Sequence, residues 1–268
     1  LVRRRPLDRV QKSPRRHRNR RRAGSALARL AGAVCVILAL SAAHAEEGSC
    51  PNETAAFERN GAVLAFPKVR VGLPNDILAI GSSSTEGIGA SSPANSYPAR
   101  LEAELEKQTG VDFDVKNAGV GGELAAKTLQ RLKSALKSGW ARLVIWQVGT
   151  NDAIVGVDET LFHATVQAGI AAARAAGVPM MLIGPQFTLK NPDPVRYERF
   201  VKMVDDIGAA DHVPVLSRYA FMKSWSAKGA KAIDLLLSGD GLHMSDLGYR
   251  CLAHALAAAI EGAAEAKL

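Results

Sequence analysis

From Asp76 to the C-terminus, short apolar segments alternate with longer amphipathic segments. The short segments suit buried strands, and the longer ones place apolar residues at the three- and four-residue spacing of helices. Strands are expected at residues 77–80, 111–116, 143–146, 178–183 and 213–216, and helices at 97–108, 123–136, 158–176, 195–207 and 245–264. This alternation predicts a three-layer α/β sandwich with a central, mainly parallel sheet of about five strands.

The first 45 residues differ from the rest of the chain and are expected to form a signal peptide. Residues 15–22 are strongly cationic, residues 30–43 are uncharged and mostly apolar, and Ala43-His44-Ala45 matches a small-x-small cleavage pattern. This order is typical of secretory signals. A membrane anchor is the competing interpretation, but the apolar run is shorter than the roughly 20 residues that span a bilayer. We expect cleavage after Ala45, a periplasmic or secreted protein, and no stable membrane anchor.

The leader also holds the positive charge of the chain, whose formal net charge is +8. It contains 12 of the 34 Lys and Arg residues and, in Asp8, one of the 26 acidic residues, so that the remaining 223 residues carry −3. A nucleic-acid-binding surface needs clustered basic residues to neutralise phosphates. We therefore expect no nucleic-acid partner. The mature protein is expected to have a polar tail over residues 46–75 and one domain over residues 76–268.

The chain has three cysteines, and export changes their interpretation. Cys35 leaves with the leader, whereas Cys50 stays near the mature N-terminus and Cys251 lies in the expected last helix. In an oxidising compartment these two thiols can pair and tether the tail to that helix. The alternative is two unpaired thiols, and the sequence does not decide between them.

Four polar motifs follow the expected strands or precede the last helix. In chain order they are Gly81-Ser82-Ser83-Ser84-Thr85, Asn117-Ala118-Gly119, Gly149-Thr150-Asn151-Asp152 and Asp240-Gly241-Leu242-His243. In parallel α/β sheets, ligands bind outside the carboxyl ends of the strands. The four motifs are therefore expected to meet in one site.

These residue types suit acyl transfer by a serine nucleophile. A serine hydroxyl attacks an ester once a neutral imidazole accepts its proton, and a carboxylate fixes the imidazole tautomer. Asp240 is three residues before His243, close enough for a compact loop to join carboxylate and ring. The backbone N–H groups of Ser83 and Gly119 and the side-chain amide of Asn151 are the expected oxyanion donors. Because Gly119 lacks a Cβ, its N–H can approach a substrate closely.

In these motifs the sequence resembles the SGNH (GDSL-type) hydrolases over roughly residues 76–260. The resemblance implies the three-layer, flavodoxin-like fold of that family and a triad of Ser83, Asp240 and His243. It also implies that Gly119 and Asn151 bind the oxyanion.

One position departs from the family pattern, because Ser82 stands where the family usually has Asp. Ser83 remains second after the glycine that ends the strand, and this register selects it as the nucleophile. Ser82 and Ser84 are the alternatives, more simply explained as loop hydroxyls that bond to nearby backbone. The missing Asp is not a triad member, so its loss should alter loop geometry and substrate preference rather than abolish activity.

Other site types find less support. The serine motif lacks the G-K-[ST] of a phosphate-binding loop, and Thr85 occupies the last position of what would be a G-x-S-x-G nucleophile elbow. His163, His212 and His254 have no second ligand at metal-binding spacing and are expected to be structural. We expect neither a metal nor a cofactor.

The expected function is an exported serine esterase that hydrolyses carboxylic esters through an acyl-enzyme. Short connections leave little material for a lid, which favours short acyl groups such as the O-acetyl groups of a glycan, or aryl esters. Alternatives within the family are a lysophospholipase, a thioesterase or an acyltransferase. An alternative from another class is a catalytically silent glycan-binding protein of the envelope, suggested by Ser82. The oligomeric state is not predicted.

Overall fold

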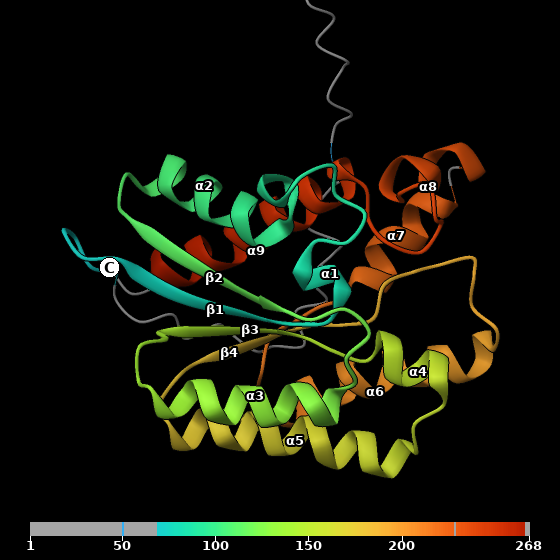
Figure 1. Cartoon of the computed structure of the whole chain (residues 1–268), viewed down its shortest axis with the longest axis horizontal. Coiled ribbons are helices and arrows are strands. Elements are labelled where there is room, and N and C mark those ends of the chain that lie inside the picture. Colours follow the sequence, from blue (N-terminus) through green and yellow to red (C-terminus); the bar gives the residue numbers. More distant parts are fainter. Residues whose placement is uncertain (1–49, 51–68, 228, 266–268) are drawn as a thin grey trace, which may run out of the picture. The chain divides into compact units, whose positions relative to one another are not determined.

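A parallel sheet forms the centre of the domain (Figure 1). The structure is a computed structural model that describes Cys50, residues 69–227 and residues 229–265. In this part of the chain the strands are β1 (Asn75–Gly81), β2 (Phe113–Gly119), β3 (Leu143–Gln147), β4 (Met180–Ile183) and β5 (Val215–Leu216). Their order is β2-β1-β3-β4-β5, and every neighbouring pair is parallel. The predicted α/β class with a five-stranded central sheet is confirmed.

Helices cover both faces of this sheet (Figure 1). One face is covered by α2 (Tyr97–Thr109), α7 (Arg218–Ser226), α8 (Ala230–Leu236) and α9 (Asp246–Glu265), and the other by α3 (Ala125–Lys137), α5 (Glu159–Ala175) and α6 (Pro194–Ala210). In β1, Ile77 and Ala79 belong to the first core, whereas Leu78 and Ile80 belong to the second. Because both faces are buried, successive strand positions are apolar, and the strands are visible in the sequence as apolar runs.

The strand order reverses at β1, which lies between β2 and β3. At such a point the loops after neighbouring strands diverge and leave a crevice in which ligands bind. The loops that follow β1 and β3 carry Ser83 and Asn151, and Gly81 lies opposite Gly119 in the register of β1 with β2. The sheet therefore brings the serine, glycine and asparagine motifs to one edge.

Three expected strands begin two residues later in the structure than expected: β2 at Phe113, β4 at Met180 and β5 at Val215. In β4 and β5 a proline lies just before the first paired residue. Pairing of β4 begins at Met180, after Pro179, and pairing of β5 begins at Val215, after Pro214. A proline has no N–H to donate to a neighbouring strand. The 3-10 helix η2 (Pro93–Asn95) and the helices α1 (Ser83–Glu86), α4 (Thr150–Val155), α7 and α8 go beyond the sequence-based expectation. Elements of one or two turns contain too few residues to show periodicity.

The predicted signal peptide lies outside the described residues, as does most of the predicted tail over residues 46–75. Cleavage after Ala45 therefore stays a prediction. Within residues 69–227 and 229–265, no helix combines the length and the apolar character that a membrane span requires.

A disulfide joins Cys50 to Cys251 in the structure, with the two Cα atoms 5.3 Å apart. Cys251 is fully buried in α9, and Cys50 packs against the same apolar core. The bond spans a sequence separation of 201 residues. Of the two interpretations that the sequence leaves open, the structure therefore has the paired form.

Loss of this disulfide should lower the free energy of unfolding by about 2–5 kcal/mol, because the bond restricts the unfolded chain across a long loop. Thermal unfolding of the Cys50→Ser variant and of the reduced parent protein checks this, and both should show a similar decrease in Tm. Reduction should also raise the mass of the parent by two hydrogens. A mass that does not change on reduction would contradict the pairing.

Candidate active site

The serine motif forms a tight turn at the end of β1. The strand ends at Gly81, and Ser83 is the first residue of α1, where it is half-buried. The first N–H groups of a helix have no partner within the helix. The fold therefore presents the Ser83 hydroxyl at the edge of the sheet beside a backbone N–H that points away from the helix.

The Ser83 side chain is hydrogen-bonded to His243, which in turn is bonded to Asp240. Ser83 Oγ lies 3.0 Å from His243 Nε2, and His243 Nδ1 lies 2.5 Å from Asp240 Oδ2. An ionised carboxylate only accepts hydrogen bonds, so the ring proton belongs on Nδ1. Nε2 is then left to accept the hydroxyl proton of Ser83, which is the arrangement that a serine nucleophile needs.

The ionised state of Asp240 is favoured by its surroundings. Burial acts to raise the pKa of this carboxyl, but hydrogen bonds from the His243 ring, from the backbone N–H groups of Leu242 and His243 and from the Ser238 hydroxyl hold the pKa well below its usual range. Oδ1 accepts the last three of these bonds, each at 2.8 Å. The compact loop expected from the three-residue spacing is therefore present, and it orients the carboxylate toward the ring.

The hydroxyls of the other two serines of the motif bond to side chains other than His243. Ser82 is buried, and its N–H and Oγ bond to Gln147 Oε1 at 2.9 and 3.0 Å. Ser84 is also buried, and its Oγ donates to Gln186 Oε1 at 3.0 Å. These contacts favour Ser83 over both alternatives, although they are made to side chains and not to the nearby backbone.

Gly119 has a different environment from the one expected of an oxyanion donor. Its N–H donates to Asn117 Oδ1 at 2.9 Å. A Cβ at this position would lie 1.9 Å from the backbone nitrogen of Glu86. Gly119 is therefore needed for the close packing of β2 against α1, and its N–H already has a partner within the loop.

The glycine loop contains another candidate donor. Most of its N–H groups are bonded: Gly119 to Asn117 Oδ1, Val120 to Gly81 O, Gly121 to Glu86 Oε2 and Glu123 to Val120 O. The N–H of Gly122 has no such partner among the described residues. Gly122 has a φ of +76°, which favours glycine, and a Cβ on Gly121 would lie 4.0 Å from Ser83 Cβ. The loop thus has an N–H without a partner in the described part of the chain, on the residue that follows Gly121, and Gly121 itself lies close to the serine. Two adjacent glycines are the sequence signal for it.

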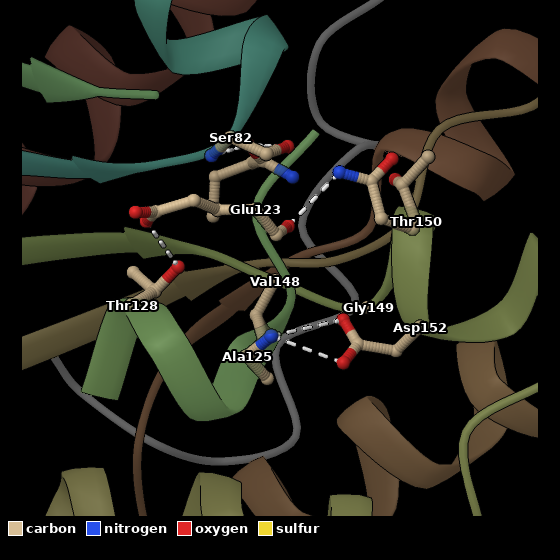
Figure 2. Close-up of a pocket in the computed structure, with 10 residues that line it drawn as sticks. Ser82, Glu123, Ala125, Thr128, Val148, Gly149, Thr150 and Asp152 are labelled. Carbon is tan, nitrogen blue, oxygen red and sulfur yellow. Dashed lines mark hydrogen bonds between the residues drawn. The ribbon is translucent and has the colours of Figure 1, made fainter. Parts of the chain in front are cut away.

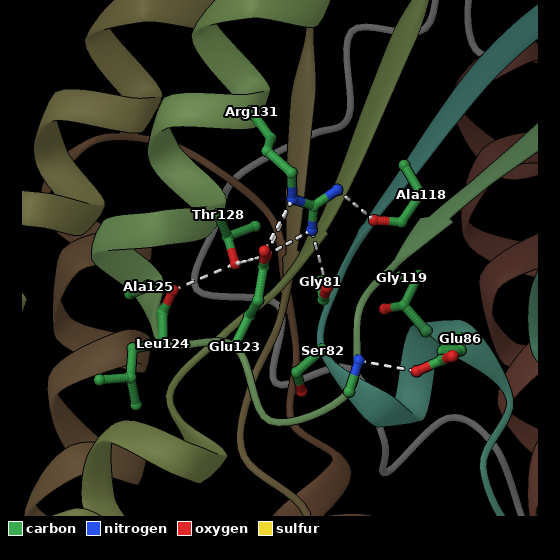
Figure 3. A network of polar contacts seen from close by, with 12 residues as sticks. Gly81, Ser82, Glu86, Ala118, Gly119, Glu123, Leu124, Ala125, Thr128 and Arg131 are labelled. Atoms are coloured by element: carbon green, nitrogen blue, oxygen red, sulfur yellow. Dashed lines mark hydrogen bonds and ion pairs between the residues drawn. The ribbon is translucent and has the colours of Figure 1, made fainter.

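Arg131 ties the glycine and serine loops together (Figure 3). Its guanidinium donates to Gly81 O at 3.2 Å and to Ala118 O at 2.8 Å, and it forms a 2.6 Å ion pair with Glu123. The ends of β1 and β2 are therefore linked through one side chain of α3. No motif in the sequence marks Arg131 or Glu123 for this role.

Asn151 and Asp152 hold the asparagine loop against the start of α3. Asn151 Nδ2 donates to Glu123 O at 2.9 Å, which leaves the second amide hydrogen of Asn151 for another acceptor. Figure 2 shows the Asp152 carboxylate directed at the backbone N–H of Ala125, in a small pocket that Ser82 also lines. The Ala125 N–H donates to Asp152 Oδ1 at 3.0 Å. This bond satisfies an N–H that α3 cannot satisfy itself. Asp152 therefore holds the asparagine loop against the start of α3.

The other histidines in the part of the chain that the structure describes lie apart from this arrangement. His254 pairs with Glu104 at 3.1 Å, His163 lies within α5, and His212 follows the end of α6 with a φ of +51°. Among the residues that the structure describes, no group of three or more His, Cys, Asp or Glu side chains is placed to hold a metal ion.

Comparisons with known proteins agree with this geometry. The family described as non-GDSL lipase-like matches residues 49–266. Esterase TesA of Pseudomonas aeruginosa is 24% identical over 167 residues, which is 62% of this chain and 78% of that protein. The chain therefore matches lipase-like sequences over most of its length.

Solved structures share the fold. A lipase/acylhydrolase from Enterococcus faecalis is 24% identical, with a TM-score of 0.60 over 70% of this chain and 96% of that chain. A catalytic mutant of the acetylxylan esterase Axe2 from Geobacillus stearothermophilus is 19% identical, with a TM-score of 0.59 over 72% and 96% of the two chains. Together with the family match, these relatives confirm the resemblance to SGNH hydrolases predicted from the sequence.

Proposed function

Because the chain belongs to the non-GDSL lipase-like family, we propose that it is a serine esterase that hydrolyses carboxylic esters through an acyl-enzyme. The observation that carries the proposal is the hydrogen-bonded series of Ser83, His243 and Asp240, with Ser83 Oγ 3.0 Å from His243 Nε2. The family is described as non-GDSL, and this chain likewise lacks the G-D-S sequence, because Ser82 stands in place of the usual Asp of the serine motif.

In the first half of the reaction, Ser83 Oγ attacks the ester carbonyl carbon and its proton moves to His243 Nε2. Asp240 stabilises the imidazolium that forms. When the tetrahedral intermediate collapses, His243 gives the proton to the departing alcohol, and the acyl group stays on Ser83. In the second half, His243 takes a proton from water, and the resulting hydroxide attacks the acyl carbon. When this second intermediate collapses, the bond between the acyl carbon and Ser83 Oγ breaks, His243 returns its proton to Ser83, and the carboxylic acid leaves.

Three donors are proposed for the oxyanion of the tetrahedral intermediate: the N–H of Ser83, the side chain of Asn151 and the N–H of Gly122. Gly122 replaces Gly119 in this role because the Gly119 N–H is bonded to Asn117. Donors aimed at the developing charge contribute a large part of the rate enhancement of such enzymes. Asn151 donates one amide hydrogen to Glu123 O, which also fixes the orientation of its second hydrogen.

The proposed substrates carry short acyl groups, such as acetyl groups on a glycan or on an aryl alcohol. Two exposed apolar residues have their backbones near the serine: the N–H of Ile88 donates to Ser83 O at 3.0 Å, and Val120 precedes Gly121, whose Cβ position lies 4.0 Å from Ser83 Cβ. They give a small apolar surface suited to a short chain. Relatives with the same fold include an acetylxylan esterase. The family alternatives are a thioesterase, a lysophospholipase and an acyltransferase. They share this chemistry, and assays with the corresponding substrates distinguish them from an esterase.

The proposed location is the periplasm or the exterior, after cleavage behind Ala45. The support is the cationic, apolar and small-x-small order of the first 45 residues, together with the Cys50–Cys251 disulfide, which suits an oxidising compartment. A glycan or other small-molecule ester outside the cytoplasm is the corresponding substrate. No observation favours the silent glycan-binding alternative, since Ser82 bonds to Gln147 without displacing Ser83.

The purified protein should hydrolyse p-nitrophenyl acetate, with kcat/KM falling roughly tenfold or more from acetyl to octanoyl esters, because the apolar surface near Ser83 is small. Steady-state kinetics on acetyl, butyryl and octanoyl esters measures this. A preference for octanoyl would contradict the short-acyl assignment. No turnover and no labelling of Ser83 by a fluorophosphonate would reject the esterase and favour a binding protein.

A further inference from the structure

Gln186 lies outside the four motifs, yet its side chain connects two of them. It follows β4 and is 1% exposed. Its Oε1 accepts a hydrogen bond from Ser84 Oγ at 3.0 Å, and its Nε2 donates to Leu242 O. Ser84 adjoins the proposed nucleophile Ser83, and Leu242 adjoins His243. One buried amide thus spans from the serine loop to the loop that carries Asp240 and His243.

The orientation of this amide follows from its partners. The guanidinium of Arg218 lies 3.4 Å from Oε1 and only donates hydrogen bonds, whereas the Leu242 carbonyl only accepts them. Reversing the amide would place donor against donor at one end and acceptor against acceptor at the other. The Gln186 side chain therefore has a single satisfied orientation, with its N–H₂ group toward the histidine loop.

The backbone of Gln186 is fixed as well. Its N–H faces Thr150 Oγ1 at 3.4 Å, and its carbonyl accepts a 2.6 Å hydrogen bond from the Tyr197 hydroxyl. Thr150 precedes Asn151, the proposed oxyanion donor. Gln186 consequently contacts the loops of the nucleophile, of the oxyanion donor and of the general base.

The guanidinium of Arg218 also contacts the Gln186 side-chain amide, on the side of its Oε1. Arg218 is fully buried, its Nε donates to Gly184 O at 2.9 Å, and no carboxylate of the described residues forms an ion pair with it. In a low-dielectric environment a cation polarises the groups bonded to it and strengthens their other hydrogen bonds. The bond from Gln186 to Leu242 O is the one directed at the catalytic loop.

Two residues that follow Gln186 also bond to the histidine loop. Thr188 Oγ1 donates to Gly241 O at 3.1 Å, and Lys190 Nζ donates to Asp240 O. Alternate side chains of an extended segment thus bond to successive carbonyls of the histidine loop, as expected from the two-residue period of an extended chain. Of these three residues, Gln186 alone also bonds to the serine loop.

We propose that Gln186 is a positioning residue that holds His243 in its place on Asp240 and Ser83 by joining the histidine loop to Ser84. The inference rests on the proposed esterase function for its kinetic consequence. Its structural part, the placement of His243 on Asp240 and Ser83, is independent of the substrate.

The test is Gln186→Glu. The carboxylate keeps the acceptor for Ser84 and gains an ion pair with Arg218, which keeps it ionised and supports the fold. Its other oxygen opposes Leu242 O, so the histidine loop should shift. We expect kcat for p-nitrophenyl acetate and the rate of fluorophosphonate labelling to fall roughly 10–100-fold, because small misplacements of reacting groups have effects of this size. KM should change little. Gln186→Asn, which is one carbon too short for the bridge, should act in the same direction.

The matched control is Gln108→Glu, the same change at an exposed position of α2, which should keep the kinetics of the parent protein. A folded Gln186→Glu protein with unchanged kcat and labelling rate would overturn the inference. The inference would also be overturned if Gln186→Glu lost kcat only in proportion to a loss of Tm and Gln186→Asn kept the kcat of the parent.

A readout that needs no turnover separates the inference from the proposed function. The hydrogen-bonded Nδ1–H of His243 should give a downfield proton NMR signal in the parent and in Gln108→Glu, assigned by its absence in His243→Ala. In Gln186→Glu the signal should shift or disappear. An unchanged signal overturns the positioning role, even in a protein that hydrolyses no ester. A changed signal together with an inactive parent would support the positioning role and reject the esterase.

Discussion

Replacing Ser83 with Ala should lower kcat for ester hydrolysis by about 10⁴-fold or more, because the nucleophile of the acyl-enzyme pathway is lost. KM should change little, since the Ser83 hydroxyl contributes mainly to the transition state. Hydrolysis of p-nitrophenyl acetate by the purified variant measures the effect, and labelling by a fluorophosphonate should disappear with it. Thermal unfolding should show a folded protein, because Ser83 Oγ bonds to His243 at the half-buried edge of the sheet and not in the core.

Ser82→Ala is the matched control for this variant. Ser82 Oγ bonds to Gln147, so its removal should affect the stability of the turn more than the chemistry and leave labelling at Ser83 intact. Turnover that survives in Ser83→Ala and is lost in Ser82→Ala would assign the nucleophile to the neighbouring residue. It would also remove the basis for the proposed mechanism.

Asp240→Asn should lower kcat by roughly 10³–10⁴-fold, because an amide N–H₂ facing the ring holds His243 in the tautomer that cannot accept the Ser83 proton. The loop itself should keep its shape. Asn Oδ1 still accepts the bonds now made to Asp240 Oδ1 by Ser238, Leu242 and His243. Steady-state kinetics and the downfield Nδ1–H signal of His243, which should be absent in the variant, check both parts. Retention of near-parent kcat would show that another group orients the histidine.

The same variant has a pH-dependent effect on stability. The folded-state pKa of Asp240 lies below its ordinary value, so the ionised carboxylate stabilises the fold at neutral pH. This contribution is lost as the pH falls through the acid range, where the carboxyl takes up a proton. The difference in Tm between the parent and Asp240→Asn should therefore narrow in acid, by a modest amount because the Asp240 side chain is 46% exposed. A gap that widens in acid would contradict the lowered pKa.

Much of the fold and of the triad is predictable from the order of residues along the chain. β1, β3 and β4 are buried on both faces, so their apolar runs mark a parallel sheet without knowledge of their partners. Ser83 follows a strand, and Asp240 and His243 are three residues apart, so local spacing is enough to suggest the serine, the carboxylate and the imidazole.

The sequence favours Gly119 as the glycine donor, and there is a physical reason why the proposed donor is Gly122 instead. A motif shows which residues are glycine, but it does not show where each N–H points. Gly119 faces α1, and its N–H is used by Asn117, whereas the N–H of Gly122 is left without a partner in the described part of the chain. Hydrogen bonding within a loop depends on its three-dimensional course.

A sequence motif also does not predict contacts between residues that are far apart in the sequence. Gln186 meets Ser84 across a separation of 102 residues and Leu242 across 56, and no local pattern marks it. The sequence leaves the pairing of Cys50 with Cys251 open for the same reason, because the two residues are 201 positions apart.

Apolar periodicity and the spacing of the four motifs are properties of short segments, and they suffice for the α/β class, the active edge of the sheet and the proposed triad. Which N–H groups remain for the oxyanion, which thiols meet and which buried amide holds His243 at Ser83 depend on packing between distant segments. Such packing follows from burial and hydrogen-bond satisfaction over the whole domain, and it exists only once the chain has folded.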